Sequence, residues 1–173
     1  MKFQHKVVAM KERRMEYRLR SGTLKRIFIA RIKRGNVLLL SLIKIVVAEG
    51  IKSGVILSVV GALSRASLRN VESLPNELPI TDENRRYTVI EKPWEVLSLS
   101  SNIGEIEDTS VVHAHITLST VQKNEVKSIG GHLVEGCVVF PFAEIVIAEI
   151  SGISMKKTFD NDTKTFQLFE ETE

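Results

Sequence analysis

Histidine is the residue type in this chain that most clearly suggests chemistry, because three of its four histidines cluster in the sequence. His113, His115 and His132 lie close together, whereas His5 lies near the N-terminus. Neutral imidazole is a good ligand for divalent transition metals, and three protein ligands plus water are typical of an open, catalytic-type zinc site. The spacing predicts a three-histidine metal site for zinc, with Ni²⁺, Fe²⁺ and Mn²⁺ left open by ligand type. The alternative is three histidines that only form hydrogen bonds on a half-exposed face.

The three rings can meet only if a hairpin has one particular register. His113 and His115 are two positions apart in a predicted strand, so both project from one face. If Lys123 and Asn124 are the central turn residues, His115 lies directly opposite His132, and cross-strand partners share a face with Cβ atoms ~5 Å apart. A slip of one residue would turn His132 to the other face. Lys-Asn is not a preferred turn dipeptide, so the pattern allows this register without requiring it.

Other residues near the histidines in the sequence offer further candidates. Gly130 and Gly131 precede His132 inside a predicted strand, which indicates a bulge or the close approach of a ligand or another backbone. Glu95 and Glu144 are candidates for a fourth ligand or a general base, although no spacing requires either role. Carboxylates of this kind more often lie at sheet edges or subunit interfaces.

The elements that must position these residues are one helix and many strands. The apolar run from Val37 to Ala48, between Asn36 as N-cap and Gly50 as C-cap residue, predicts a buried helix. Strands are predicted at residues 24–32, 54–60, 66–71, 87–90, 95–100, 111–119, 128–139 and 144–150, with two short ones near Lys157 and Phe166. One helix among so many strands indicates an α+β fold, with a mainly antiparallel sheet packed against one principal helix.

Charge is distributed unevenly along the 173 residues. Residues 1–35 hold 12 of the 24 Lys and Arg but only two acids, whereas the rest holds 12 basic and 19 acidic residues. A basic arm on an acidic body is one way to hold nucleic acid, and a solvated arm or one that pairs with a neighbouring subunit is the alternative. The candidate phosphate-binding residues in the arm are Lys11, Arg13, Arg14, Arg18 and Arg20. We predict a basic extension over residues 1–20 and a single domain over residues 21–173.

Compartment and membrane association are predicted from what the sequence lacks. A single cysteine, Cys137, fits a reducing compartment. The longest apolar run, from Val37 to Val47, is interrupted by Ser41 and Lys44 and is too short to span a bilayer. No signal-peptide pattern is visible. The sequence therefore predicts a cytoplasmic protein without a membrane span.

Several ordered motifs carry a family resemblance. Residues 54–63 (GVILSVVGAL), 94–100 (WEVLSLS), 112–119 (VHAHITLS), 130–136 (GGHLVEG) and 144–147 (EIVI) resemble the PPC domain, the plants and prokaryotes conserved domain also called DUF296. The resemblance implies a compact α+β domain, a homotrimer, and the DNA-associated description given to stand-alone prokaryotic members. It also implies that the histidine pattern can hold a metal.

The chain departs from the plant pattern of this family, because it contains no Arg-Gly-Arg-Pro core of an AT-hook. The arginines that would enter a minor groove are therefore absent, which argues against that form of DNA binding. Three functions stay open: a metal-dependent enzyme or small-ligand-binding protein, a DNA-associated protein, and a plain assembly module. Whether any reaction is catalysed is not determined by the sequence.

Overall fold

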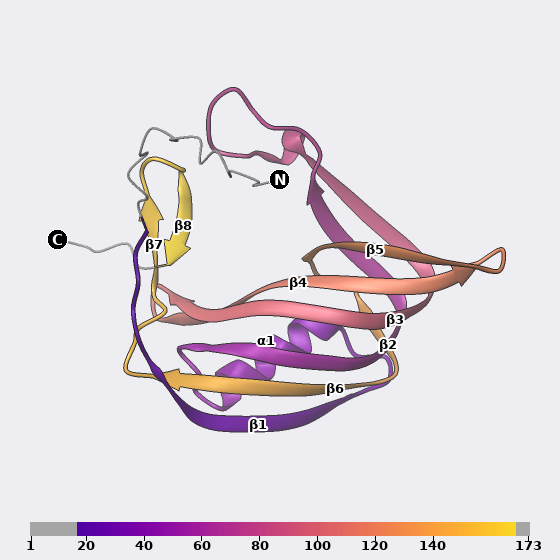
Figure 1. Cartoon of the computed structure of the whole chain (residues 1–173), viewed down its shortest axis with the longest axis horizontal. Helices are drawn as coiled ribbons and strands as arrows, with labels where there is room; N and C mark the ends of the chain where they lie inside the picture. Colours follow the sequence, from indigo (N-terminus) through magenta and orange to yellow (C-terminus); the bar gives the residue numbers. More distant parts are fainter. Residues whose placement is uncertain (1–16, 169–173) are drawn as a thin grey trace, which may run out of the picture.

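The computed structural model describes residues 17–168 and has an α+β architecture, as predicted (Figure 1). The sheet is antiparallel in every strand pairing, and α1 is the one α-helix of the described residues. The elements in chain order are β1 (Thr23–Lys33), α1 (Leu38–Ala48), β2 (Gly54–Val71), η1 (Asp82–Asn84), β3 (Arg85–Ile106), β4 (Thr109–Gln122), β5 (Glu125–Leu133), β6 (Val138–Ser151), β7 (Lys157–Asp160) and β8 (Thr165–Leu168).

The main sheet curls until its far edge meets its middle. Its strand order is β1-β6-β2-β3-β4-β5, and β5 also pairs with β2, which closes the strands β2 to β5 on themselves. The closing contacts are Leu68 opposite Leu133 and Arg69 opposite His132. Strands β7 and β8 form a separate two-stranded ribbon at one end of the sheet (Figure 1). The closure brings the end of β2 against β5, which carries His132.

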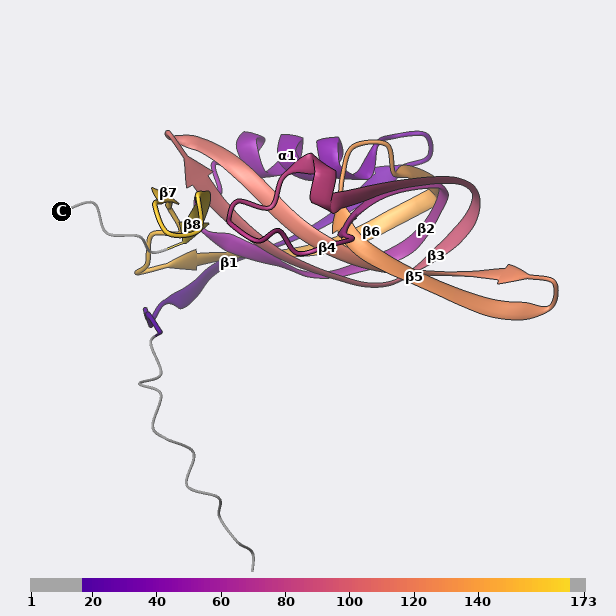
Figure 2. The ribbon, with the colours of Figure 1, turned by 90° about the horizontal axis from the view of Figure 1, so that it is seen from above.

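Helix α1 packs on one face of the sheet, and Figure 2 shows it as a layer of its own. Leu38, Leu42 and Val46 recur every four residues and are fully buried in the core. The helix begins at Leu38 with Val37 as N-cap, so the predicted capping by Asn36 is wrong. The side-chain amide of Asn36 instead donates a hydrogen bond to the backbone carbonyl of Lys33 in the preceding turn. Within the described residues no helix is long and apolar enough to cross a membrane.

Two strands are longer than the sequence predicts. Residues 54–60 and 66–71 belong to one continuous strand, β2, and residues 87–90 and 95–100 both belong to β3. The register of β2 shifts between Gly61 and Leu63 and again between Leu63 and Arg65. Bulges of this kind bend a strand while its pairing continues, so the interval between the two predicted strands, residues 61–65, is a bend instead of a break. The predicted strand 128–139 is conversely divided, because a turn separates β5 from β6.

The β4–β5 hairpin has the register that places His115 opposite His132. Lys123 and Asn124 are the two turn residues, and both have left-handed backbone angles, with φ of 51° and 63°. Positive φ at both central positions is what a type I′ turn demands, and this turn matches the twist of the flanking strands. The tip of the hairpin projects beyond the body of the sheet in both views (Figures 1 and 2).

Candidate metal centre

The hairpin places His113, His115 and His132 around one point. His115 lies directly opposite His132 in the ladder, as predicted, and His113 lies on the same face of β4. One ligand nitrogen from each ring can be chosen so that all three lie within 4.8 Å of one another. The ring centroids are 4.8 Å apart for His113 and His132, and 5.3 Å apart for the other two pairs. Convergence of the three imidazoles is therefore a property of the fold.

The surroundings keep two of these rings, those of His113 and His132, in the form that binds metals. Burial, followed in size by the positive charge of Arg69, lowers the pKa of His132 from 6.5 to about 4. Burial and then the charge of Lys157 lower the pKa of His113. Both shifts favour neutral imidazole at neutral pH, and only the neutral ring has a free lone pair for a metal.

One pair of donor atoms already has the spacing that a tetrahedral ion requires, and all three lie within 4.8 Å of one another. Nε2 of His115 lies 3.4 Å from Nδ1 of His132. A tetrahedral zinc bonded to two nitrogens at ~2.0–2.1 Å holds them ~3.3–3.4 Å apart. Among the described residues the cluster contains no carboxylate or thiolate ligand. The three residues thus fit a divalent transition metal with a further coordination position for water or a ligand.

The glycine pair before His132 makes room for a clamp between β5 and β2. A Cβ atom on Gly131 would lie 2.7 Å from both terminal atoms of the Asn70 amide. That amide donates a hydrogen bond to the carbonyl of Gly130 at 3.1 Å. Gly131 therefore allows Asn70 to hold the end of β2 against β5, beside the pair of Arg69 and His132. The β4–β5 register runs through both glycines without a shift, so neither forms a bulge in this hairpin. The group that approaches Gly131 is the side chain of Asn70 and not the predicted ligand or backbone.

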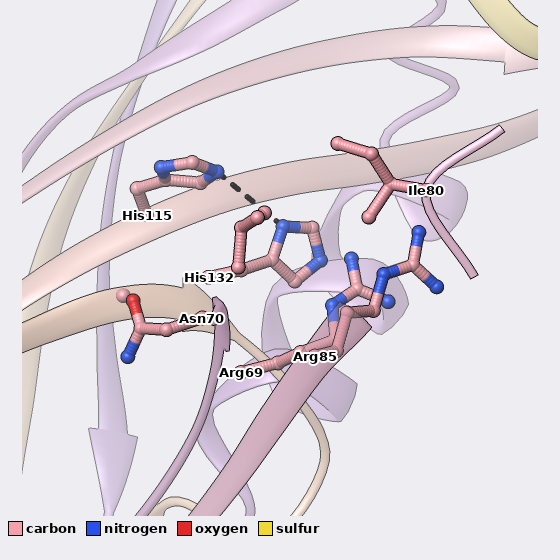
Figure 3. Close-up of a pocket in the computed structure, with 8 residues that line it drawn as sticks. Arg69, Asn70, Ile80, Arg85, His115 and His132 are labelled. Carbon is pink, nitrogen blue, oxygen red and sulfur yellow. Dashed lines mark hydrogen bonds between the residues drawn. The ribbon is translucent and has the colours of Figure 1, made fainter. Parts of the chain in front are cut away.

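Two hollows flank the histidines, and no sequence pattern predicted either of them. One, of about 380 Å³, is lined by His115 and His132 together with Arg69, Arg85 and Ile80 (Figure 3). The other, of about 410 Å³, is lined by His113 and His115 together with Ser100 and Asn102, which lie opposite these histidines on β3. No local pattern could indicate these neighbours, because they come from pairings between distant strands.

Glu95 and Glu144 lie outside the cluster. Glu95 on β3 pairs with Ala62 and Ser119, five residues along the strand from Ser100, which is the partner of His115. The carboxylate of Glu144 forms an ion pair with Arg31 across β1 and β6, at 2.8 Å. Neither belongs to the group of side chains able to share an ion with the histidines. Glu144 is instead a charged residue paired across neighbouring strands of the sheet, close to the alternative given for such carboxylates.

Only part of the candidate basic arm can be located. Arg18 and Arg20 precede β1 and are exposed. Lys11, Arg13 and Arg14 lie outside the described residues. Cys137 is buried directly before β6, where its thiol donates a hydrogen bond to the carbonyl of Ser67. Burial raises the pKa of this thiol, so it has the character of a core side chain.

The family to which this chain belongs follows from its match to a family sequence model. The sequence model of the Plants and Prokaryotes Conserved (PCC) domain matches residues 19–151. The chain belongs to this family. The matched segment of this PPC-domain protein includes all three clustered histidines, both flanking arginines and the glycine pair.

Solved structures with the same fold come from several organisms. A metal-containing protein from Archaeoglobus fulgidus superposes with a TM-score of 0.70 at 23% identity, covering 89% of this chain and 100% of its own. A PPC protein from Pyrococcus horikoshii gives 0.68 at 24% identity, covering 91% and 99%. A candidate DNA-binding protein from Bacteroides thetaiotaomicron gives 0.65 at 19%, covering 85% and 96%. At these identities the likeness establishes the fold.

Two curated relatives are much larger proteins. The bifunctional proteins GlmU of two Synechococcus strains are each 30% identical, over 131 and 147 residues that cover 76% and 85% of this chain. The chain spans only 18% and 20% of these proteins. The likeness thus concerns about a fifth of each relative.

Proposed function

We propose that this PPC-domain protein binds a divalent transition metal, zinc in the first place, through His113, His115 and His132. The observation that carries the proposal is the convergence of three ring nitrogens within 4.8 Å, on a face where burial favours neutral imidazole. The metal-containing description of the Archaeoglobus neighbour adds support. Three nitrogen ligands leave one position open, so such an ion could polarise a bound ligand or activate water. The site thus suits a metal-dependent enzyme or a small-ligand-binding protein.

Elemental analysis of protein purified without an affinity tag tests the proposal. We expect about one zinc or other transition-metal ion per chain, lost in the His113→Ala/His115→Ala variant. His5→Ala removes a histidine outside the cluster and is the matched control, which should keep its metal. Absence of metal from the wild-type protein after incubation with Zn²⁺, or full metal content in the double variant, would contradict it.

Association with DNA is a second candidate, supported by the descriptions of structural neighbours and by the basic sequence of residues 1–35. The proposed extension over residues 1–20 would contact phosphates, beside a single domain over residues 21–173. Binding of this kind weakens steeply with salt, because phosphate contacts release counterions. Deletion of residues 1–20 should lower both the affinity and the salt dependence. An affinity that salt and the deletion leave unchanged would exclude phosphate contacts by this segment.

A homotrimer is the third part of the proposal, and an apolar sheet face supports self-association. Five exposed apolar side chains are each next in sequence to a residue that packs in the core beneath α1. Successive side chains of a strand point to opposite faces, so these five lie on the face of the sheet away from α1. Their exposures run from 50% to 82%. They are Ile27, Ile29, Leu57, Val60 and Leu97. Several exposed apolar side chains on one sheet face favour a protein interface there.

Mass measurement in solution tests this assembly. We expect three times the chain mass of 19.4 kDa. Val60→Lys should shift the mass toward the single chain, whereas Leu74→Lys, at an exposed position in the loop before η1, should not. A wild-type monomer would refute the trimer.

A further inference from the structure

The pocket beside the histidines has a strongly positive wall. Arg69 lies directly opposite His132 in the β2–β5 pairing, so both side chains are on the same face. Arg85 pairs with Val71, two residues further along β2, and therefore lies next to Arg69. Figure 3 shows the two guanidinium groups side by side next to the ring of His132, with Ile80 across from them. Both arginines are half-buried.

Little of this positive charge is neutralised by the protein. Arg85 forms an ion pair with Asp82 at 3.1 Å, but that carboxylate is 76% exposed and also accepts a hydrogen bond from the hydroxyl of Tyr87. Within residues 17–168, Arg69 has no carboxylate at ion-pair distance. Lys157 approaches the cluster from β7, close enough for its charge to act on His113. Asp82 is thus the one carboxylate that the described residues place against Arg69 and Arg85, and it is mostly exposed to solvent. A wall with more positive than negative charge is complementary to an anion.

The metal proposed above would increase this excess. Three neutral imidazoles leave the full double charge of the ion in place, because the cluster contains no acidic ligand. Arg69 lies at the edge of this candidate metal site, since Arg69 and His132 are cross-strand neighbours. A planar guanidinium donates two parallel hydrogen bonds to a carboxylate or phosphate, which is the geometry this neighbour offers.

We infer that Arg69 and Arg85 bind the oxyanion group, carboxylate or phosphate, of a small molecule whose other contact is the metal on the three histidines. The inference deepens the proposed function and rests on it for the second anchor. A small molecule is favoured over a polymer by the shape of the site. The hollow of about 380 Å³ has the size of a small-ligand pocket, and Ile80 and Gly131 are among the residues that line it.

Calorimetric titration of inorganic phosphate, and separately of oxalate, into the zinc-loaded full chain tests the inference. The wild type should bind at least one of the two anions. Arg69→Gln should weaken that binding by about tenfold or more, because a charged hydrogen-bonding group is lost. Arg85→Gln should weaken it less, because Asp82 already shares its charge. Arg86→Gln is the matched control: it removes the same charge from the next residue of β3, whose side chain binds Glu72 outside the pocket.

Elemental analysis of each variant separates the anion site from the metal site. Unchanged metal content together with weakened anion binding in Arg69→Gln supports the inference. Equal affinities in Arg69→Gln and wild type, or no binding of either anion, would overturn it. If Arg69→Gln does not fold, the comparison of Arg85→Gln with Arg86→Gln decides.

Two further outcomes have defined meanings. If wild-type protein takes up no metal, the proposed function fails, and titration of the metal-free protein decides the anion pocket alone. Arg69-dependent phosphate or oxalate binding would retain it, and its absence would overturn it. If duplex DNA binds through Arg69 while neither small anion does, the pocket serves nucleic acid and the small-molecule inference is wrong.

Discussion

Acidification of the metal-free protein should reveal the cost of burying His132. Burial, and next the charge of Arg69, lower the pKa of this ring from 6.5 to about 4 in the folded state. Between these values the unfolded chain binds more protons than the folded one, so the free energy of unfolding falls as the pH falls. The interval corresponds to about 3.4 kcal/mol at ~1.36 kcal/mol per pH unit. Because the ring is only half-buried and solvent screens its charge, we expect a loss of about 1–2 kcal/mol.

Urea unfolding at pH 7.5 and pH 4.5 measures this loss. Other groups also titrate in that range, so the informative quantity is the difference between wild type and His132→Asn, which cannot bind the proton. The wild type should lose about 1–2 kcal/mol more than the variant. His5→Asn, which changes a histidine outside the cluster, should behave as the wild type does. Equal losses in wild type and His132→Asn would refute the argument that burial depresses this pKa.

Three further predictions concern the clamp at Gly131, the core under α1 and the binding of zinc. Gly131→Ala displaces the Asn70 amide and its hydrogen bond to Gly130. In a double-mutant cycle with Asn70→Ala, the free energies of urea unfolding should show a coupling of about 1 kcal/mol. Additive losses of stability in the double variant would contradict the clamp. Leu42→Ala removes a fully buried helix side chain and should cost about 2–5 kcal/mol, whereas Leu40→Ala, at a partly exposed helix position, should cost less by the same assay. Free Zn²⁺ at a hundred times its dissociation constant should raise the free energy of unfolding of the wild type by about 2.7 kcal/mol, as measured by thermal or urea unfolding. The stability of His113→Ala/His115→Ala should not change. Equal stabilisation of both proteins would place the zinc elsewhere.

The features that the sequence predicted well are those that depend on short-range pattern. Alternation placed His113 and His115 on one face, and counting from Lys123 and Asn124 placed His132 opposite His115. The helix from Val37 to Ala48 was evident from its continuous apolar run. Each of these depends on neighbours within about 20 residues, where hairpin register and helix periodicity determine the geometry.

The features that were missed depend on contacts between distant strands. Arg69 reaches His132 only because β2 is a single bent strand whose end pairs with β5, whereas the sequence predicted two separate strands, 54–60 and 66–71. The role of Gly131 likewise depends on Asn70, 61 positions earlier in the chain. Glu144 was a candidate near the histidines by residue type alone, whereas its partner is Arg31 across β1 and β6. No local pattern contains these pairings.

Anomalous X-ray scattering at the zinc absorption edge, from crystals of zinc-loaded protein, tests the central claim most directly. The account predicts one strong peak per chain, within ~2.1 Å of one nitrogen of each of His113, His115 and His132. Crystals of His113→Ala/His115→Ala should show no peak at that place. A peak elsewhere on the wild-type chain, or no peak after loading with zinc, would contradict the three-histidine metal site.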